Sequence, residues 1–187
     1  MSYCAFVNGL PADSDDPNKH YHDREYGYPI EGDDALFGRL LLEINQAGLS
    51  WTLMLRKQAA FERAYDRFSI DKVAAYGDAE RQRLLNDAGI VRNRLKVDAA
   101  IHNAHRIAVL QGTHGSFKAW LDAHHPLALA DWTRLFKQQF KFVGGEIVNE
   151  FLMSTGYLPD AHVPDCPVHA RVLRAGPAWA LRAAVNP

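Results

Sequence analysis

The stretch Glu43-Ile44-Asn45-Gln46-Ala47-Gly48-Leu49-Ser50-Trp51 decides how the chain is organised. It follows an apolar run, residues 36–42, in which leucine and phenylalanine recur at helical spacing. We therefore expect a buried helix, capped at its start by Asp33 or Asp34 and stopped by Gly48 in the left-handed conformation. Ser50 is then placed to cap a second helix that opens with Trp51.

Glu43 is the unusual residue of this stretch. Burial disfavours an ionised carboxylate, and the negative end of the helix macrodipole repels one. An apolar residue, Leu49, follows at the expected tip of the turn. Two interpretations are open at this point. The corner is either a functional site that combines Glu43, Leu49 and Trp51, or a solvated glutamate beside ordinary core residues.

Most of the remaining chain has helical periodicity. We expect helices at about residues 51–68, 71–76, 79–87, 95–110, 117–124, 132–139 and 146–155, and a helical tail broken at Gly176-Pro177. Residues 8–20 have the composition of a loop, and residues 22–29 that of a polar turn. No segment alternates as a strand should, so the sequence predicts an all-α protein with one domain over residues 1–187.

Composition limits the classes of function. The chain has 187 residues, of which 48% are hydrophobic and 23% charged, as in a globular protein. No apolar run reaches the roughly 18 residues of a membrane span, so we expect no membrane contact. The first residues lack a secretory signal, which favours the cytoplasm. The net charge is −1, so DNA binding would need a local basic cluster.

Such a cluster lies at Asp87-Ala88-Gly89-Ile90-Val91-Arg92-Asn93-Arg94, a very short turn between two helical patterns. Gly89 permits a positive φ or a close approach of another segment. Amides at the start of the next helix can bind a phosphate, and Arg92, Arg94 and Lys96 add positive charge. From the residues alone, the segment is either a hairpin that binds a DNA backbone or an αα-corner with solvated arginines.

A second pattern suggests a metal. His162-Val163-Pro164-Asp165-Cys166 is a His-x₃-Cys pair, and Cys4 is the only other cysteine. Tetrahedral zinc accepts two cysteines and two histidines, and His22 could complete such a set with Cys4. The chain has nine histidines, which makes chance pairs easy, so spacing alone leaves a zinc site and coincidence both open.

Taken with His22-Asp23-Arg24-Glu25-Tyr26-Gly27, the stretch from Glu43 to Trp51 resembles the type I 3-methyladenine DNA glycosylases, base-excision repair enzymes with a helix–hairpin–helix fold. The resemblance runs from Cys4 to about Cys166. It implies that residues 84–97 hold the family's hairpin, and that a structural zinc joins the terminal segments, around residues 1–27 and 157–170. All four ligand positions match: Cys4, His22, His162 and Cys166.

The resemblance also implies a pocket for the damaged base. Glu43 would be its catalytic carboxylate. The aromatic partners would be Tyr21 and Trp51, together with Phe6 and Tyr26, which stand where many members have tryptophan. Leu49 resembles the wedge that fills the vacated base stack, and Gln46 would support it. The remaining DNA contacts would come from Gly89, Arg92, Arg94 and Lys96.

The implied activity is monofunctional excision of 3-methyladenine from alkylated double-stranded DNA by base flipping. We expect a monomer and no protein partner. No lysine matches a nucleophile, and the family pattern gives Asp98 no role in activating water. Two alternatives are kept. One is a glycosylase for another cationic alkylated base, since Phe6 and Tyr26 depart from the common pattern. The other is a module that recognises DNA damage without cleaving, against which the intact Glu43, Tyr21 and Trp51 argue.

Overall fold

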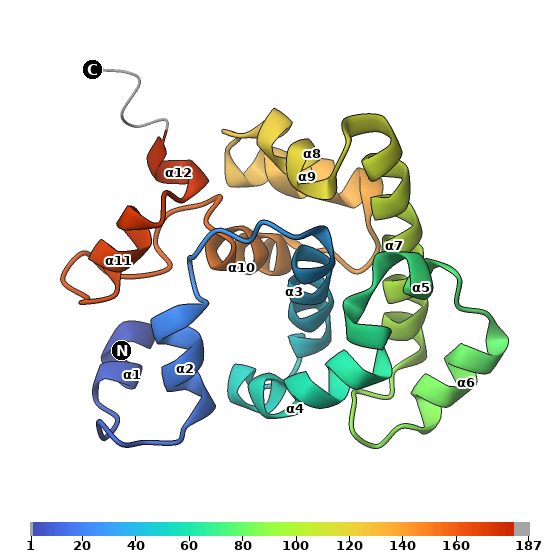
Figure 1. The fold of residues 1–187 in the computed structure, drawn as a ribbon, viewed down its shortest axis with the longest axis horizontal. Coiled ribbons are helices and arrows are strands. Elements are labelled where there is room, and N and C mark those ends of the chain that lie inside the picture. Colours follow the sequence, from blue (N-terminus) through green and yellow to red (C-terminus); the bar gives the residue numbers. More distant parts are fainter. Residues whose placement is uncertain (1, 182–187) are drawn as a thin grey trace. The chain divides into compact units, whose positions relative to one another are not determined.

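The structure is a computed structural model that describes residues 2–181, and every regular element within that range is a helix, as the sequence predicts (Figure 1). The chain divides into two compact units. One comprises Met1–Ile30 with Asn149–Pro187, and the other comprises Glu31–Val148. The terminal segments that the sequence assigns to a metal site therefore belong to one unit, although more than a hundred residues separate them in the chain.

The first unit contains α1 (Tyr3–Asn8), α2 (Pro17–Arg24), α11 (His169–Arg174) and α12 (Ala178–Leu181), and α1 packs against α2. The break between α11 and α12 lies at the predicted Gly176-Pro177. The prediction of loop for residues 8–20 holds for residues 9–16, but residues 17–24, predicted as loop and polar turn, form α2. Asp16 accepts a hydrogen bond from the Asn18 amide at 2.9 Å, and Pro17 occupies the first helical position. Asp-Pro is a helix-start signal that the loop-like composition concealed.

The second unit is built around α7 (Arg94–His114), a helix of 21 residues. The other elements of this unit are α3 (Asp33–Gln46), α4 (Trp51–Ala64), η1 (Asp66–Phe68), α5 (Ile70–Ala74), α6 (Asp78–Asn86), α8 (Phe117–His124) and α9 (Leu129–Gln139). The long helix α7 packs against α3, α5, α6 and α8. The remaining helix, α10 (Gly145–Ser154), begins at the end of this unit, and its later residues belong to the first unit.

The helix α3 carries the deciding stretch through the core. Residues 36–45 are all buried, and a Cβ on Gly38 would lie 2.5 Å from the Phe68 ring, so only glycine admits that ring. Gly48 follows the helix with φ +84°, as predicted. The helix α4 is shorter than expected. It ends at Ala64, because residues 66–68 form a left-handed turn with φ between 50° and 59°.

The two acids at the start of α3 have a different role from the one predicted. The N-cap of α3 is Gly32, and no side chain caps it. Asp33 instead accepts the Phe117 amide at 2.7 Å, at the start of α8, and Asp34 accepts the Ile70 amide at 3.0 Å, at the start of α5. These carboxylates therefore tie α3 to two neighbouring helices.

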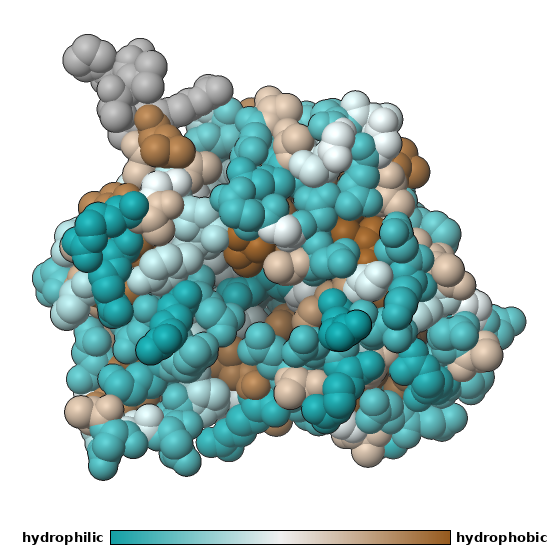
Figure 2. Space-filling model, in the orientation of Figure 1, coloured by the Kyte–Doolittle hydropathy of each residue, from teal (hydrophilic) through white to brown (hydrophobic). Residues whose placement is uncertain are grey.

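Polar residues cover most of the face drawn in Figure 2, and the hydrophobic areas on it are small and separate. In the described part of the chain, the large hydrophobic side chains that are exposed include Phe6, Leu95 and Phe142. Among the described residues, none of the helices combines the length and the apolar character needed to cross a membrane.

Candidate functional site

Four metal-ligating side chains meet in the first unit. Cys4 lies on α1, His22 on α2, and His162 and Cys166 on the segment between α10 and α11. Their ligand atoms all lie within 4.8 Å of one another, and all four residues are buried. The structure thus brings together the four predicted ligands in a cluster that could hold a metal ion.

The ring nitrogens of both histidines are oriented for a metal. His22 turns Nδ1 to Asp23 Oδ1 at 2.7 Å and Nε2 to Cys166 Sγ at 3.6 Å. His162 turns Nε2 to the Tyr26 carbonyl at 2.8 Å and Nδ1 to Cys4 Sγ at 3.5 Å. An N–H donated to an outer acceptor leaves the other nitrogen with its lone pair facing the centre, as metal-binding histidines require.

The distances fit tetrahedral zinc. Bond lengths near 2.3 Å to sulfur and 2.05 Å to nitrogen, at the tetrahedral angle, separate the two ligand atoms by about 3.6 Å. Three sulfur–nitrogen distances in the cluster are 3.5, 3.6 and 3.9 Å. The Asn8 side-chain amide also donates to Cys166 Sγ at 3.8 Å. Burial raises the pKa of the Cys4 thiol, so that thiol is protonated at neutral pH until a metal binds.

The aromatic residues that the sequence assigns to the base pocket from the first unit form one cluster. Tyr21 and Tyr26 are buried, with ring centroids 5.5 Å apart, and the Tyr26 hydroxyl donates to Glu150 at 3.2 Å. Phe6 is exposed and stacks on Tyr3 at 6.4 Å. Sequence reasoning missed Tyr3, whose ring meets Tyr26 edge-on at 5.5 Å and lies 6.4 Å from Tyr21.

The acid and the tryptophan belong to the second unit. Glu43 is 3% exposed on α3, one helical turn before Gln46. Trp51 is half-buried and opens α4, where Ser50 accepts the Leu53 amide at 3.3 Å as the predicted cap. Glu43 is therefore not the solvated residue of the alternative interpretation, because its side chain is enclosed in the protein.

Gln46, the last residue of α3, makes two hydrogen bonds to the backbone of the Leu49 turn, residues 47–50. The carbonyl of Gln46 accepts the Leu49 amide at 2.7 Å, and the side chain of Gln46 donates to the Leu49 carbonyl at 2.9 Å. Leu49 is half-buried and its neighbours Ala47, Gly48 and Ser50 are exposed. Gln46 thus holds the backbone of the residue that the sequence predicts as the wedge.

The Gly89 hairpin, residues 87–93, joins α6 to α7. Gly89 donates its amide to Asp87 Oδ1 at 2.7 Å, and a Cβ on Gly89 would lie 3.1 Å from that of Ala60 on α4. A side chain at this position would press against Ala60, so Gly89 suits a close approach, one of the two reasons that the sequence offered. Arg92 and Arg94 are exposed, and Arg94 pairs loosely with Asp98 at 3.9 Å.

One predicted DNA contact, Lys96, differs from the expectation. Lys96 is 5% exposed and donates to the carbonyls of Asn45 at 3.0 Å and Ala47 at 2.9 Å. Its ammonium is therefore used inside the protein and is not presented to a phosphate. Burial lowers the pKa of Lys96. Asp98 accepts a hydrogen bond from Arg81 at 2.9 Å, which engages its carboxylate in an ion pair.

Comparison with known proteins shows the family to which the chain belongs. Residues 12–169 match the methyladenine glycosylase family. The chain is 33% identical over 165 residues to DNA-3-methyladenine glycosylase 1 of Escherichia coli (strain K12), a match that covers 78% of this chain and 88% of that protein. It is 29% identical over 166 residues to the DNA-3-methyladenine glycosylase of Haemophilus influenzae, with 79% and 89% covered.

Solved structures show the same fold. A tyrosine-to-phenylalanine variant of 3-methyladenine DNA glycosylase I in complex with 3-methyladenine has a TM-score of 0.79 and 30% identity, covering 90% of this chain and 97% of that one. The enzyme from Staphylococcus aureus has a TM-score of 0.78 and 31% identity, with 90% and 96% covered. Fold and sequence together are those of a DNA glycosylase. The chain belongs to the methyladenine glycosylase family.

Proposed function

We propose that the protein is a monofunctional DNA glycosylase that flips 3-methyladenine out of alkylated double-stranded DNA and cleaves its bond to deoxyribose. The observation that carries the proposal is the buried carboxylate of Glu43, which lies at the end of α3 directly before the Leu49 turn. Membership of the methyladenine glycosylase family supports the choice of base.

The chemistry asked of the protein is modest. A 3-methyladenine attached to deoxyribose carries a positive charge, and the base leaves as a neutral molecule. The protein has to extrude the nucleotide, bind the base and reject normal adenine. A carboxylate in an enclosed site attracts a cation far more strongly than one in water, and it accepts hydrogen bonds from the exocyclic amino group. We assign this role to Glu43.

Aromatic faces would hold the extruded base by stacking and cation–π contact. We assign this role to Tyr21 and Trp51, with Phe6 and Tyr26 as further candidates. Leu49 would fill the space that the base leaves in the stack, and Gln46 would keep its backbone in place. Arg92 and Arg94 would neutralise phosphates, and the Gly89 hairpin would lie against the DNA backbone, although the Gly89 amide itself is donated to Asp87. We leave Lys96 out of this set because its ammonium is buried.

We further propose that Cys4, His22, His162 and Cys166 bind one structural zinc. Four protein ligands close the coordination shell, so the ion would stabilise the fold of the first unit and would have no position for a reactive water. Two buried cysteines that form no disulfide are typical of a reducing compartment, and this supports a cytoplasmic location of the protein. We expect a monomer, which light scattering of the purified protein would measure.

The test is release of free base from methylated duplex DNA, with the released bases separated by chromatography. We expect 3-methyladenine as the main product and no strand cleavage by a lyase step. Glu43→Gln serves as the matched variant, because glutamine keeps the size and removes the charge. Release of another methylated base instead would establish the first alternative. Tight binding to methylated DNA without any base release would establish a damage-recognition module.

A further inference from the structure

The Leu49 turn and the Gly89 hairpin are cross-linked by two lysines, each of which comes from the helix that follows the other turn. Lys57 on α4, the helix after the Leu49 turn, donates to the Gly89 carbonyl at 3.0 Å and reaches that of Ala88 at 3.5 Å. Lys96 on α7, the helix after the Gly89 hairpin, donates to the carbonyls of Asn45 and Ala47. The Gly89 hairpin thus receives the ammonium of Lys57 from α4, and the Leu49 turn receives that of Lys96 from α7.

The Lys96 contact satisfies the end of α3. The last carbonyls of a helix have no donor within the helix, and α3 closes without the backbone bond that completes most helix ends. Gln46 uses its own carbonyl for the Leu49 amide. Lys96 supplies donors to the carbonyls on either side of it, at Asn45 and Ala47, and places a positive charge at the negative end of the helix.

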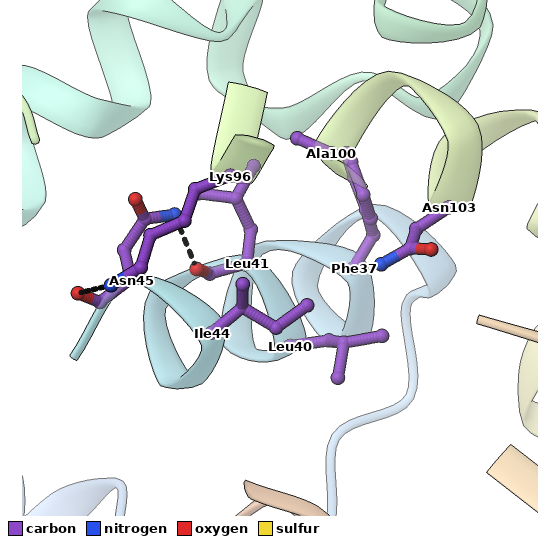
Figure 3. Close-up of a pocket in the computed structure, with 8 residues that line it drawn as sticks. All are labelled: Phe37, Leu40, Leu41, Ile44, Asn45, Lys96, Ala100 and Asn103. Carbon is purple, nitrogen blue, oxygen red and sulfur yellow. Dashed lines mark hydrogen bonds between the residues drawn. The ribbon is translucent and has the colours of Figure 1, made fainter. Parts of the chain in front are cut away.

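Figure 3 shows Lys96 reaching from α7 across the end of α3 to the Asn45 carbonyl, beside the bond from the Asn45 side chain to the Leu41 carbonyl. The space around them is a narrow crevice lined by apolar side chains of α3, among them Phe37, Leu40 and Ile44. A lysine is seldom enclosed in this way, because its ammonium loses hydration. A methionine would fill the same crevice without losing hydration, but it would leave the Asn45 and Ala47 carbonyls without the donor that Lys96 supplies. The ammonium is therefore specific to these two carbonyls.

The other half of the link is similarly specific. Lys57 is half-buried, and its two acceptors lie on the hairpin next to the predicted phosphate contacts. The close approach of Gly89 to Ala60 brings the hairpin against the same helix. Asn93 adds a local tie, because its side chain accepts the Lys96 amide at 3.2 Å.

We propose that Lys57 and Lys96 are positioning residues that fix the Leu49 turn relative to the Gly89 hairpin, so that the wedge enters the duplex at a set distance from the anchored phosphates. This inference rests on the proposed function. Extrusion of a nucleotide needs a wedge that is held against a fixed grip on the backbone, and misplacement by about 1 Å can cost about a hundredfold in rate. Base recognition by Glu43 does not require the link.

The decisive variant is Lys96→Met, which keeps the apolar stem and removes the ammonium. In single-turnover excision from methylated duplex DNA we expect a loss of about ten- to a hundredfold. Methylated single-stranded DNA presents bases that need no extrusion from a duplex, so the loss there should be much smaller. Affinity for free 3-methyladenine, measured by calorimetry, should stay at the wild-type value. Leu49→Ala should give the same pattern, since it removes the wedge itself.

Hydrogen exchange supplies a readout that does not depend on activity. The Leu49 amide should exchange faster in Lys96→Met than in the wild type, and the Gly89 and Ile90 amides should exchange faster in Lys57→Met. Because Lys57 is half-buried, its variant should fold even if Lys96→Met does not. The double variant should lose less than the product of the two single losses, since both break one link. Lys137→Met, an exposed residue of α9, is the control and should match the wild type.

Equal losses on duplex and single-stranded DNA, or weaker binding of the free base, would overturn the proposal, because Lys96 would then support the pocket or the fold. Wild-type excision from the duplex by Lys96→Met and Lys57→Met would overturn it as well. An inactive wild-type protein would instead reject the proposed function. The exchange rates of the two turns would still show whether the lysines link them.

Discussion

The Nδ1 atom of His22 lies 2.7 Å from Oδ1 of Asp23, so two adjacent residues provide a metal ligand and the carboxylate that orients it. The other nitrogen of His22 is thereby directed to the cluster, where Cys166 Sγ lies 3.6 Å away. This arrangement of carboxylate, histidine and metal site is a recurrent way to raise the basicity of the ligand and to fix its tautomer.

Asp23→Asn should therefore weaken zinc binding although Asp23 is not itself a ligand. We expect a loss of about ten- to a hundredfold in zinc affinity, because the amide supports the imidazole less well than the carboxylate does. Competition with a chromophoric chelator measures this affinity. Asp15→Asn, an exposed position in the same unit, is the matched control. Equal affinities of Asp23→Asn and the wild type would contradict this role of Asp23.

Cys4→Ala should lower the thermal stability of the protein, because it removes one of four ligands that tie the terminal segments together. Metal that binds the folded state adds to the free energy of unfolding. A strong chelator should lower the melting temperature of the wild type toward that of Cys4→Ala, and should hardly change the variant. Melting followed by circular dichroism, with metal analysis of both proteins, decides it. A wild type that contains no zinc and ignores the chelator would rule out the site.

Zinc affinity should fall as the pH falls. Zinc binds thiolates and neutral imidazoles, so protons compete with the metal for the same atoms. Burial raises the pKa of Cys4, which means that its thiol carries a proton at neutral pH and must release it when zinc binds. Calorimetry in buffers of different ionisation enthalpy counts the protons released. Proton release near zero at neutral pH would show that Cys4 does not bind the metal as a thiolate.

Arg92→Ala and Arg94→Ala should each weaken DNA binding by about the same factor for every sequence. Loss of one phosphate contact reduces the slope of log affinity against log salt by about one unit. Arg94 shares its charge with Asp98, so its effect should be the smaller of the two. Titrations at several salt concentrations measure both slopes, with Arg174→Ala as the exposed control from α11. An altered sequence preference would point to base contacts instead.

Glu43→Gln should lose far more excision activity than DNA affinity. A charged hydrogen bond is worth about 1.5–3 kcal/mol, or about ten- to a hundredfold in rate if it is felt in the transition state. DNA affinity rests on phosphate contacts elsewhere and should change little. Glu62→Gln, an exposed acid of α4, is the control for loss of one negative charge. Equal losses of activity and affinity in Glu43→Gln would make Glu43 a structural residue.

Local sequence signals determined much of the fold. Apolar spacing located α3, Gly48 ended it with a positive φ, and Ser50 capped α4. The break of the tail at Gly176-Pro177 followed from the same kind of signal. In each case the interaction joins residues within one or two turns, so the sequence order itself brings the partners together. The metal ligands were predicted by resemblance, since their spacing alone left coincidence open.

Contacts between distant segments were decided only by the tertiary structure. Asp33 is of a residue type that often caps its own helix, yet it accepts the amide of Phe117, the first residue of α8, which lies 84 residues later. Lys96 follows a basic hairpin and looks like a phosphate ligand, yet its ammonium reaches the end of α3. A long lysine side chain can donate either to a phosphate or to backbone carbonyls, and the sequence does not state which carbonyls lie within its reach. Packing of α7 against α3 makes that choice, because it encloses Lys96 and offers it two unpaired carbonyls in place of water.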